Sequence, residues 1–207
     1  MSQPLNWQRL DQVSPLLAVL PDAARRTARV IDVPQGGLVF NRGDRPKVMY
    51  FVISGAVHLV RRSISGNEIV LQRADHGVLA EASLDQTAYH CDAIAALPSS
   101  LLSLPRKAFS ESLADERFRN RWIAHLAREL RRIRAQSERL SLKTAHERIV
   151  HYIETEGERG SITLTHSKKS WATELGLSHE ALYRTLAHMK RTGLVSINGP
   201  RISLQRD

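Results

Sequence analysis

The spacing of hydrophobic residues changes twice along the chain. Residues 4–30 carry leucines at helical spacing, whereas residues 33–104 consist of short apolar runs separated by glycine, asparagine and aspartate. Short runs bounded by turn residues are typical of strands, and several at this spacing predict a compact β-barrel or jelly roll. Helical spacing returns at residue 106. We predict an α+β chain of three parts, with boundaries at residues 1–114, 115–141 and 142–207.

The helix predicted within residues 106–141 has a narrow apolar stripe. Its members step by three and four residues and are Ile123, Leu126, Leu130, Ile133, Ser137 and Leu140. Such an a/d repeat is the seam of a two-stranded coiled coil, so we predict a dimerisation helix in a parallel homodimer. The alternative is a helix that covers its own domain, but at ~1.5 Å per residue it would overhang a small β-domain. The arginines expected around the seam are Arg128, Arg131, Arg132, Arg134 and Arg139.

The stretch from residue 163 to 195 predicts two short helices joined by a tight turn. Ser167 and Ser178 are suitable N-caps, because a serine hydroxyl accepts a backbone N–H that the first helical turn leaves unpaired. Gly176 suits the turn, since glycine adopts a left-handed conformation at little cost. The dipeptide Asn198-Gly199 then predicts a β-hairpin. Two helices with a tight turn, followed by a hairpin, form a winged helix-turn-helix, and we predict this motif at the C-terminal end.

The outward face of the second helix carries side chains that can read DNA. His179 with Tyr183, and Glu180 with Arg184, are spaced i,i+4 and therefore project side by side. Arginine can donate two hydrogen bonds to guanine, and glutamate can accept one from cytosine. The alternative is a solvated face with an intrahelical ion pair. The predicted DNA-contacting residues are Ser167, Lys168, Lys169, Ser178, His179, Glu180, Tyr183, Arg184 and Arg201.

Composition supports a polyanionic partner and disfavours several other classes. The net charge is +9 and the isoelectric point is near 10.3, and counterion release draws basic proteins to nucleic acid. A single cysteine excludes an intramolecular disulfide and a four-cysteine cluster within one chain. No signal peptide or membrane-length apolar run is seen, so we expect a cytoplasmic protein without a membrane partner. No nucleophile–base arrangement, phosphate-cradling glycine loop or HExxH motif indicates an enzyme.

The order of roll, long helix and winged helix resembles the cAMP receptor protein/FNR family of bacterial transcription regulators. The resemblance rests on GGLVFNRGD and MYFVISGAVHLVRRSISGNEIVL in the roll and on KKSWATELGLSHEALYRTL in the helix-turn-helix. It implies a cyclic-nucleotide-binding-type β-roll and a homodimer on palindromic double-stranded DNA, with Glu180 and Arg184 at base-contacting positions. It also implies activation through RNA polymerase, for which the loop 156–161 is the candidate contact.

The roll departs from the pattern of cAMP-binding family members. Those members present a Gly-Glu pair and then an Arg-Ser pair, and the matching pairs here are Ala80-Glu81 and His90-Cys91. The hydroxyl pair that receives adenine is matched by Ile133-Arg134. Without the arginine a buried phosphate would lack its partner, so we expect that cAMP is not bound. The candidate effector pocket consists of Glu81, His90, Cys91 and Arg134.

Other interpretations stay open. We expect no cofactor or metal, but His90 and Cys91 together could supply imidazole and thiolate for sensing haem, a metal or oxidants. A buried structural cysteine is the simpler interpretation, because free cysteine is among the most buried residue types. A regulator controlled only by its expression level needs no ligand at all. A ligand-binding module without specific DNA binding is a further alternative, which a DNA shift assay would separate.

Overall fold

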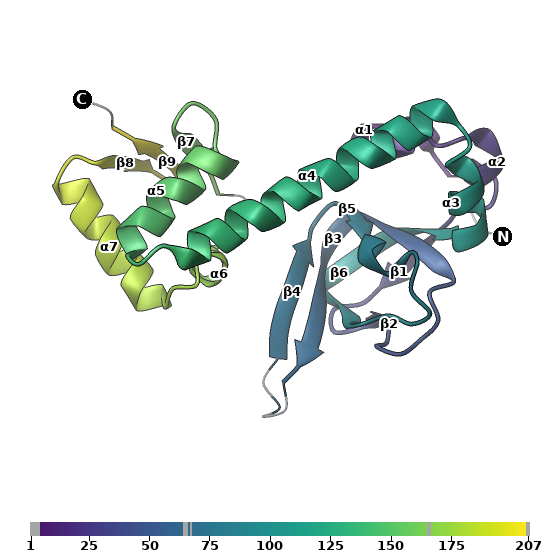
Figure 1. Cartoon of the computed structure of the whole chain (residues 1–207), viewed down its shortest axis with the longest axis horizontal. Coiled ribbons are helices and arrows are strands. Elements are labelled where there is room, and N and C mark those ends of the chain that lie inside the picture. Colours follow the sequence, from purple (N-terminus) through teal and green to yellow (C-terminus); the bar gives the residue numbers. More distant parts are fainter. Residues whose placement is uncertain (1–4, 64–65, 67, 165–166, 206–207) are drawn as a thin grey trace. The chain divides into compact units, whose positions relative to one another are not determined.

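The computed structural model describes residues 5–63, 66, 68–164 and 167–205. The chain divides into two compact units, Met1–His125 and Leu126–Asp207, and α4 (Glu116–Ser141) is one continuous helix that contributes residues to both (Figure 1). The α+β class predicted from the sequence is confirmed. The long helix predicted over 115–141 corresponds to α4, whereas the division between the compact units falls inside this helix.

The first unit begins with short helices and continues into an antiparallel β-roll (Figure 1). The helices are α1 (Trp7–Val13), the 3₁₀ turn η1 (Leu17–Val19) and α2 (Asp22–Arg25). The helical prediction for residues 4–30 is wrong at its end, because β1 already begins at Arg29. The strands are β1 (Arg29–Val33), β2 (Leu38–Phe40), β3 (Val48–Arg62), β4 (Glu68–Ala74), β5 (Gly77–Leu79) and β6 (Asp92–Pro105).

Two long strands, β3 and β6, form the centre of the roll. The sheet order is β1-β6-β3-β4, with β2 paired to β6 and β5 paired to β3, and all pairs are antiparallel. The register between β3 and β6 shifts on both sides of Gly55, which has a φ of +90°. A side chain at Gly55 would meet the Pro98 carbonyl oxygen, so only glycine fits there. Gly55 therefore bends a continuous strand and does not end it.

Hydrophobic residues of the first unit form two clusters. The cluster inside the roll includes Phe40 and Tyr89, whose rings stack at 3.8 Å between centroids. The other cluster joins the N-terminal helices to the sheet, to α3 (Arg106–Ser112) and to the start of α4. Phe118 and Trp122 of α4 are buried in it. The first turns of α4 therefore do cover their own domain, as the alternative interpretation of this helix expected.

The helical region predicted over 106–141 contains two helices, α3 and α4, and the break between them lies close to the predicted boundary at 114/115. The chain turns between them, and the Asp115 carboxylate accepts the backbone N–H of Phe118 at 2.9 Å. A carboxylate that accepts from the third following residue is typical of an N-cap. The sequence signal for this break was therefore present in Asp115.

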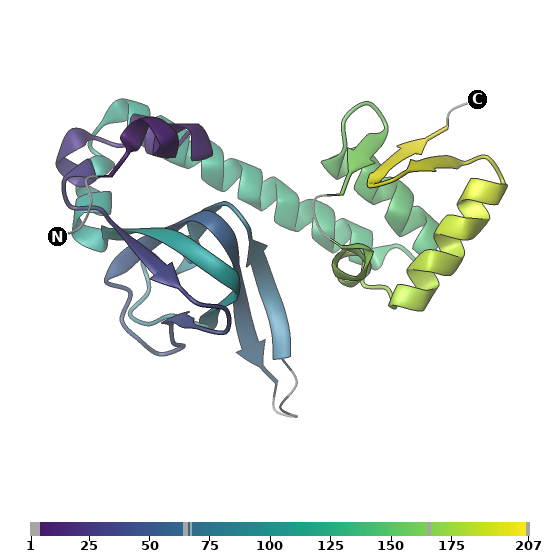
Figure 2. The same cartoon turned by 180° about the vertical axis from the view of Figure 1, so that it is seen from behind.

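The second unit is a winged helix-turn-helix (Figure 2). Its helices pack around Trp171, Leu182 and Met189, and its three strands pair in the order β7-β9-β8. The hairpin turn is Gly199-Pro200, one residue later than the predicted Asn198-Gly199, and Asn198 still pairs with β9. The elements are α5 (Ala145–Glu156), β7 (Ser161–Thr163), α6 (Lys168–Glu174), α7 (His179–Arg191), β8 (Val195–Asn198) and β9 (Arg201–Leu204).

Candidate nucleic-acid interface and effector pocket

Both helices of the helix-turn-helix begin at the predicted caps. Ser167 accepts the Ser170 N–H at 3.2 Å, and the Ser178 side chain accepts the Ala181 N–H at 3.1 Å. Gly176 lies in the turn with a φ of +63°, in the left-handed region that favours glycine. The caps and the turn thus fix where α7 begins and how it leaves α6.

The exposed face of α7 brings the predicted reading residues together. The rings of His179 and Tyr183 lie 4.5 Å apart, and Arg184 lies 3.8 Å from Glu180. The side chains of Arg184 and Glu180 are 75% and 88% exposed, so their ion pair is weak and both groups are open to another partner. Lys168 of α6 places its ammonium group 5.6 Å from the Tyr183 ring, which joins α6 to this face.

The remaining predicted cations lie on other elements. Lys169 is exposed on α6, and Arg201 is exposed at the start of β9, where it pairs with Asn198 of β8 and Thr163 of β7. Arg201 is thus part of the wing and not of the helix face. These positions are suited to backbone phosphates, which need charge and not a defined donor pattern.

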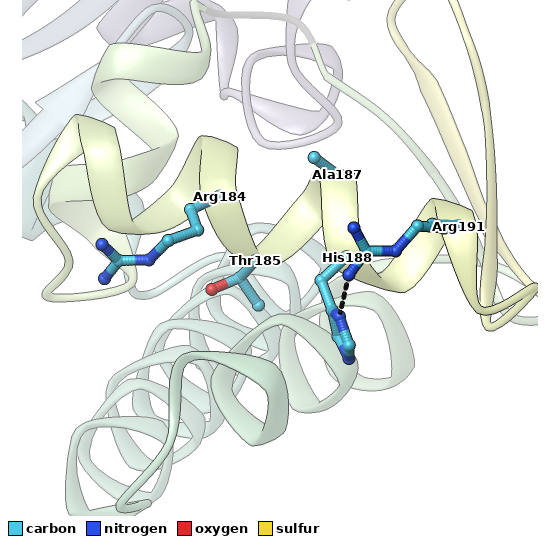
Figure 3. Close-up of a pocket in the computed structure, with 5 residues that line it drawn as sticks. All are labelled: Arg184, Thr185, Ala187, His188 and Arg191. Carbon is cyan, nitrogen blue, oxygen red and sulfur yellow. Dashed lines mark hydrogen bonds between the residues drawn. The ribbon is translucent and has the colours of Figure 1, made fainter.

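A depression in the α7 surface was missed by the sequence analysis. The α7 depression has a volume of about 460 Å³ and is lined by Arg184, Thr185, Ala187, His188 and Arg191 (Figure 3). Arg191 Nη2 lies 3.1 Å from His188 Nδ1. The signal that could have found this site is the i, i+4, i+7 spacing of Arg184, His188 and Arg191, which places all three on one helix face.

Arg148 of α5 connects the end of α4 with the turn of the helix-turn-helix. Its Nε donates to the Leu142 carbonyl at 3.0 Å and its Nη2 donates to that of Leu140 at 3.3 Å. Its Nη1 donates to the carbonyls of Gly176 and Leu175 at 3.1 and 3.2 Å. A cation at the carbonyl end of a helix also complements the helix dipole. One guanidinium therefore fixes the turn before α7 against the end of α4.

Arg139, one of the arginines expected around the seam, is buried. Its Nη2 donates to Glu156 at 3.0 Å, and its guanidinium lies 4.4 Å from the Tyr152 ring centroid. The Tyr152 hydroxyl in turn donates to Glu174 at 3.0 Å. Burial and the Glu174 carboxylate raise the pKa of Tyr152, so it stays a hydrogen-bond donor at neutral pH. This network holds α4, α5 and α6 together.

The predicted seam of α4 lies at the surface of the single chain. The exposed fractions of its five large apolar residues range from 39% for Leu126 to 61% for Ile133. Contiguous exposed apolar residues are unusual on a monomeric protein and mark an interaction surface. The seam residues described as exposed are Ile123, Leu126, Leu130, Ile133, Ser137 and Leu140.

Glu81 of the candidate effector pocket faces α4. It opens the 3₁₀ turn η2 (Glu81–Ser83), and its Oε1 lies 4.0 Å from Nε2 of His125, which stacks on Trp122 at 5.2 Å. The residue before it, Ala80, has a φ of +60°, a left-handed conformation that is costly for alanine. The backbone therefore keeps a glycine-like geometry although the glycine is absent.

His90 and Cys91 point to different environments. His90 is exposed, with Nδ1 3.3 Å from the Ser83 hydroxyl, whereas Cys91 is completely buried in the roll. Burial and the nearby Asp92 raise the pKa of the Cys91 thiol to about 11, so the thiol is protonated at neutral pH. Arg134, the fourth predicted pocket residue, is exposed on α4 in the second unit.

The described residues contain neither a metal-binding cluster nor a membrane-spanning helix. No group of three or more histidine, cysteine, aspartate or glutamate residues in the described ranges is arranged to hold a metal ion. No helix among the same residues is long and apolar enough to cross a membrane.

Comparison with known proteins gives matches over both units. Residues 30–116 match the family described as Cyclic nucleotide-binding domain. The chain is 30% identical over 175 residues to the Cyclic AMP receptor protein of Thermus thermophilus, an alignment that covers 81% of this chain and 79% of that protein. The solved structure of the Thermus thermophilus Catabolite Activator Protein has 26% identity and a TM-score of 0.52, covering 93% of this chain and 94% of that one. DNR from Pseudomonas aeruginosa has 26% identity and a TM-score of 0.55, covering 100% and 96%.

Proposed function

Because the chain belongs to the cAMP receptor protein/FNR family of transcription regulators, we propose that it is a homodimer that binds a specific double-stranded DNA site. The observation that carries the proposal is the exposed face of α7. Glu180 and Arg184 stand free of the core on this face, while Leu182, Leu186 and Met189 bury the opposite side of the helix. The helix is thus held firmly and presents its polar side to a partner.

The exposed residues are expected to make two kinds of DNA contact, one to base edges and one to backbone phosphates. Arg184 is placed to donate two hydrogen bonds to the O6 and N7 atoms of a guanine, and Glu180 to accept one from a cytosine amino group. Lys168, Lys169 and Arg201 are the expected phosphate contacts, because they are single cations around the reading face. The net charge of +9 supports this assignment.

The seam of α4 is the proposed dimer interface. Pairing the seams of two copies in a coiled coil would bury the exposed apolar residues, including Leu130 at 49% and Ile133 at 61%. It would also present two α7 helices to successive major grooves, ~34 Å apart on one side of the duplex. The expected DNA site is therefore palindromic.

The roll is proposed to act without cAMP, a cofactor or a metal. The Thermus thermophilus relative is named for cAMP, but in this chain the pair that matches the family's Arg-Ser pair is His90, which is exposed, and Cys91, which is buried. Neither supplies a permanent positive charge for a cyclic phosphate. We expect regulation of transcription and no enzymatic activity, since the chain belongs to a family of transcription regulators.

The loop 156–161 is the proposed contact for RNA polymerase. Glu158 and Ser161 exchange two backbone hydrogen bonds at 2.8 and 2.9 Å, and the two residues between them, Arg159 and Gly160, have φ angles of +50° and +72°. Two positive φ angles are those of a tight hairpin turn. The loop is therefore a tight turn with Glu158 and Arg159 exposed at its tip, and this tip is the proposed docking point.

Arg184→Ala tests base reading directly. Binding is measured by fluorescence anisotropy on a duplex selected by the wild-type protein from a random pool and on a mixed-sequence duplex. We expect a loss of ~1–3 kcal/mol on the selected duplex, relaxed preference at one base pair, and little change on mixed DNA. Arg201→Ala is the control and should weaken both duplexes evenly. Equal losses on both duplexes for Arg184→Ala would refute base reading.

A further inference from the structure

The α7 depression is formed by a single helix. All of its lining residues belong to α7 (Figure 3), and within the described part of the chain none comes from α5, α6 or β8, the elements that pack against this helix. Its charged lining consists of Arg184, which lies 3.8 Å from the exposed Glu180, and Arg191, and none of the described residues that line it is a carboxylate. The depression is therefore a positive, concave surface and suits an anion.

The contact between Arg191 and His188 determines which ring nitrogen of His188 carries a proton and how the Arg191 side chain is oriented. A guanidinium has no acceptor, so Arg191 must donate and Nδ1 of His188 must accept at 3.1 Å (Figure 3). The imidazole then carries its proton on Nε2, where it can donate a hydrogen bond. The same contact holds Arg191 along the depression while its other N–H groups remain available. His188 and Arg191 thus present donors to the same small volume.

The position of Arg191 on α7 favours the DNA backbone over the bases. The N-terminal residues of a recognition helix contact base edges. Arg191 lies seven residues after Arg184, which corresponds to ~10 Å along the helix. The major groove is ~12 Å wide, so a cation displaced by this distance reaches a strand that borders the groove.

We infer that the α7 depression binds a phosphate of the DNA backbone, with Arg191 as the ligand and His188 as the residue that positions it. The inference rests on the proposed DNA binding and adds a contact to it. A guanidinium is well suited to a phosphate because its planar fork can donate two parallel hydrogen bonds. An arginine that is already oriented also loses less side-chain entropy when the anion arrives.

Arg191→Ala tests the phosphate contact in the full-length protein. The association constant for DNA is measured at several KCl concentrations, on the selected duplex and on the mixed-sequence duplex. We expect Arg191→Ala to weaken both duplexes by the same factor and to lower the salt slope by ~0.9 per protomer, or ~1.8 for a dimer. Lys190→Ala is the matched control, because Lys190 is exposed in the same last turn of α7 but does not line the depression. It should keep the wild-type slope.

The role of His188 needs a readout that a purely structural role would not change. His188→Leu removes the acceptor for Arg191 and should weaken both duplexes by roughly two- to tenfold, the cost of ordering one long side chain. His188→Asn keeps a side-chain acceptor and should recover most of this loss. Both substitutions are at an exposed position, so the melting temperature serves as the folding control. Equal affinities for the Leu variant and the wild type would remove His188 from the inference.

The outcomes separate this inference from the proposed function. A wild-type protein that binds neither duplex refutes the proposed function, and the phosphate site with it. A wild type that binds, together with Arg191→Ala at unchanged affinity and slope, refutes the phosphate site alone. A loss for Arg191→Ala on the selected duplex only would show base reading by Arg191 and would also overturn the inference.

Discussion

Arg148 should stabilise the second unit, because its side chain connects the end of α4 with the turn before α7. Arg148→Met removes the guanidinium and keeps an unbranched apolar stem in the same place. The wild-type side chain donates four hydrogen bonds of 3.0–3.3 Å, two to the end of α4 and two to the turn before α7. All four acceptors are backbone carbonyls, so the substitution leaves four acceptors to find water or remain unpaired.

The size of the effect follows from the number and type of these bonds. A hydrogen bond to a charged group contributes about 1.5–3 kcal/mol, but four bonds made by one side chain are not additive. We therefore expect the second unit to lose about 2–4 kcal/mol of its free energy of unfolding, or roughly 30- to 1000-fold in the opening equilibrium. The first unit should not change, because both ends of the connection lie in Leu126–Asp207.

Hydrogen exchange with mass spectrometry distinguishes the two units in the full-length protein. For Arg148→Met, peptides from α6 and α7 should exchange faster by the same factor, whereas peptides from β3 and β6 should keep wild-type protection. The exchange rates of these peptides in Arg148→Lys should lie between those of the wild type and those of Arg148→Met, since one ammonium group cannot replace all four donated hydrogen bonds. Arg132→Met is the control, because Arg132 is exposed on α4. Unchanged protection of α6 and α7 in Arg148→Met would refute the reasoning.

Three further predictions follow from the seam, the thiol and the roll. Leu130→Glu places two like charges in the proposed interface and should yield a monomer by light scattering with no binding to the selected duplex; a wild-type monomer at micromolar concentration would contradict the interface. The pKa of Cys91 is raised to about 11, so its neutral form is favoured by folding. The contribution of the neutral thiol to folding stability is fully present below the ordinary thiol pKa and is lost as pH rises toward 11. At pH 8 the Cys91 thiol of the folded protein should react with a disulfide reagent at least ~100-fold more slowly than the same thiol in the urea-unfolded chain. Rapid labelling of the folded protein would contradict this. Millimolar cAMP should leave the melting temperature of the protein unchanged. A ligand present at 100 times its Kd would add about 2.7 kcal/mol to the free energy of unfolding, so a clear rise in melting temperature with cAMP would overturn the proposed loss of cAMP binding.

The parts of the structure that depend on local chemistry were predictable from the sequence. Ser167 and Ser178 cap their helices as expected, and Gly176 adopts the positive φ that the turn requires. Thr144 and Glu147 form a capping box at the start of α5, a pattern that is likewise confined to four residues. The exposed seam of α4 also agrees with its 3-4 spacing, since periodicity reports directly which residues share a face.

The errors concern residues whose partners are distant in sequence. Arg139 and Arg148 have the appearance of surface arginines, but their partners are contributed by other elements, as far as residue 176. Gly55 resembles the glycines that end strands, yet the close approach of Pro98 makes it a bend within β3. These distant contacts leave no periodic pattern in the sequence. His188 and Arg191, by contrast, are three residues apart and share one face of α7 by their spacing, but their mutual contact depends on side-chain orientation.

The most direct test of the account is selection of DNA sites from a random duplex pool by the purified full-length protein. We expect an enriched site with two inverted half-sites whose centres are one helical turn, ~34 Å, apart, because two α7 helices on a coiled-coil dimer must enter successive major grooves. Arg184→Ala should enrich the same symmetric site with one base pair per half-site relaxed. A pool that shows no enrichment, or a single half-site bound by a monomer, would contradict the central claim.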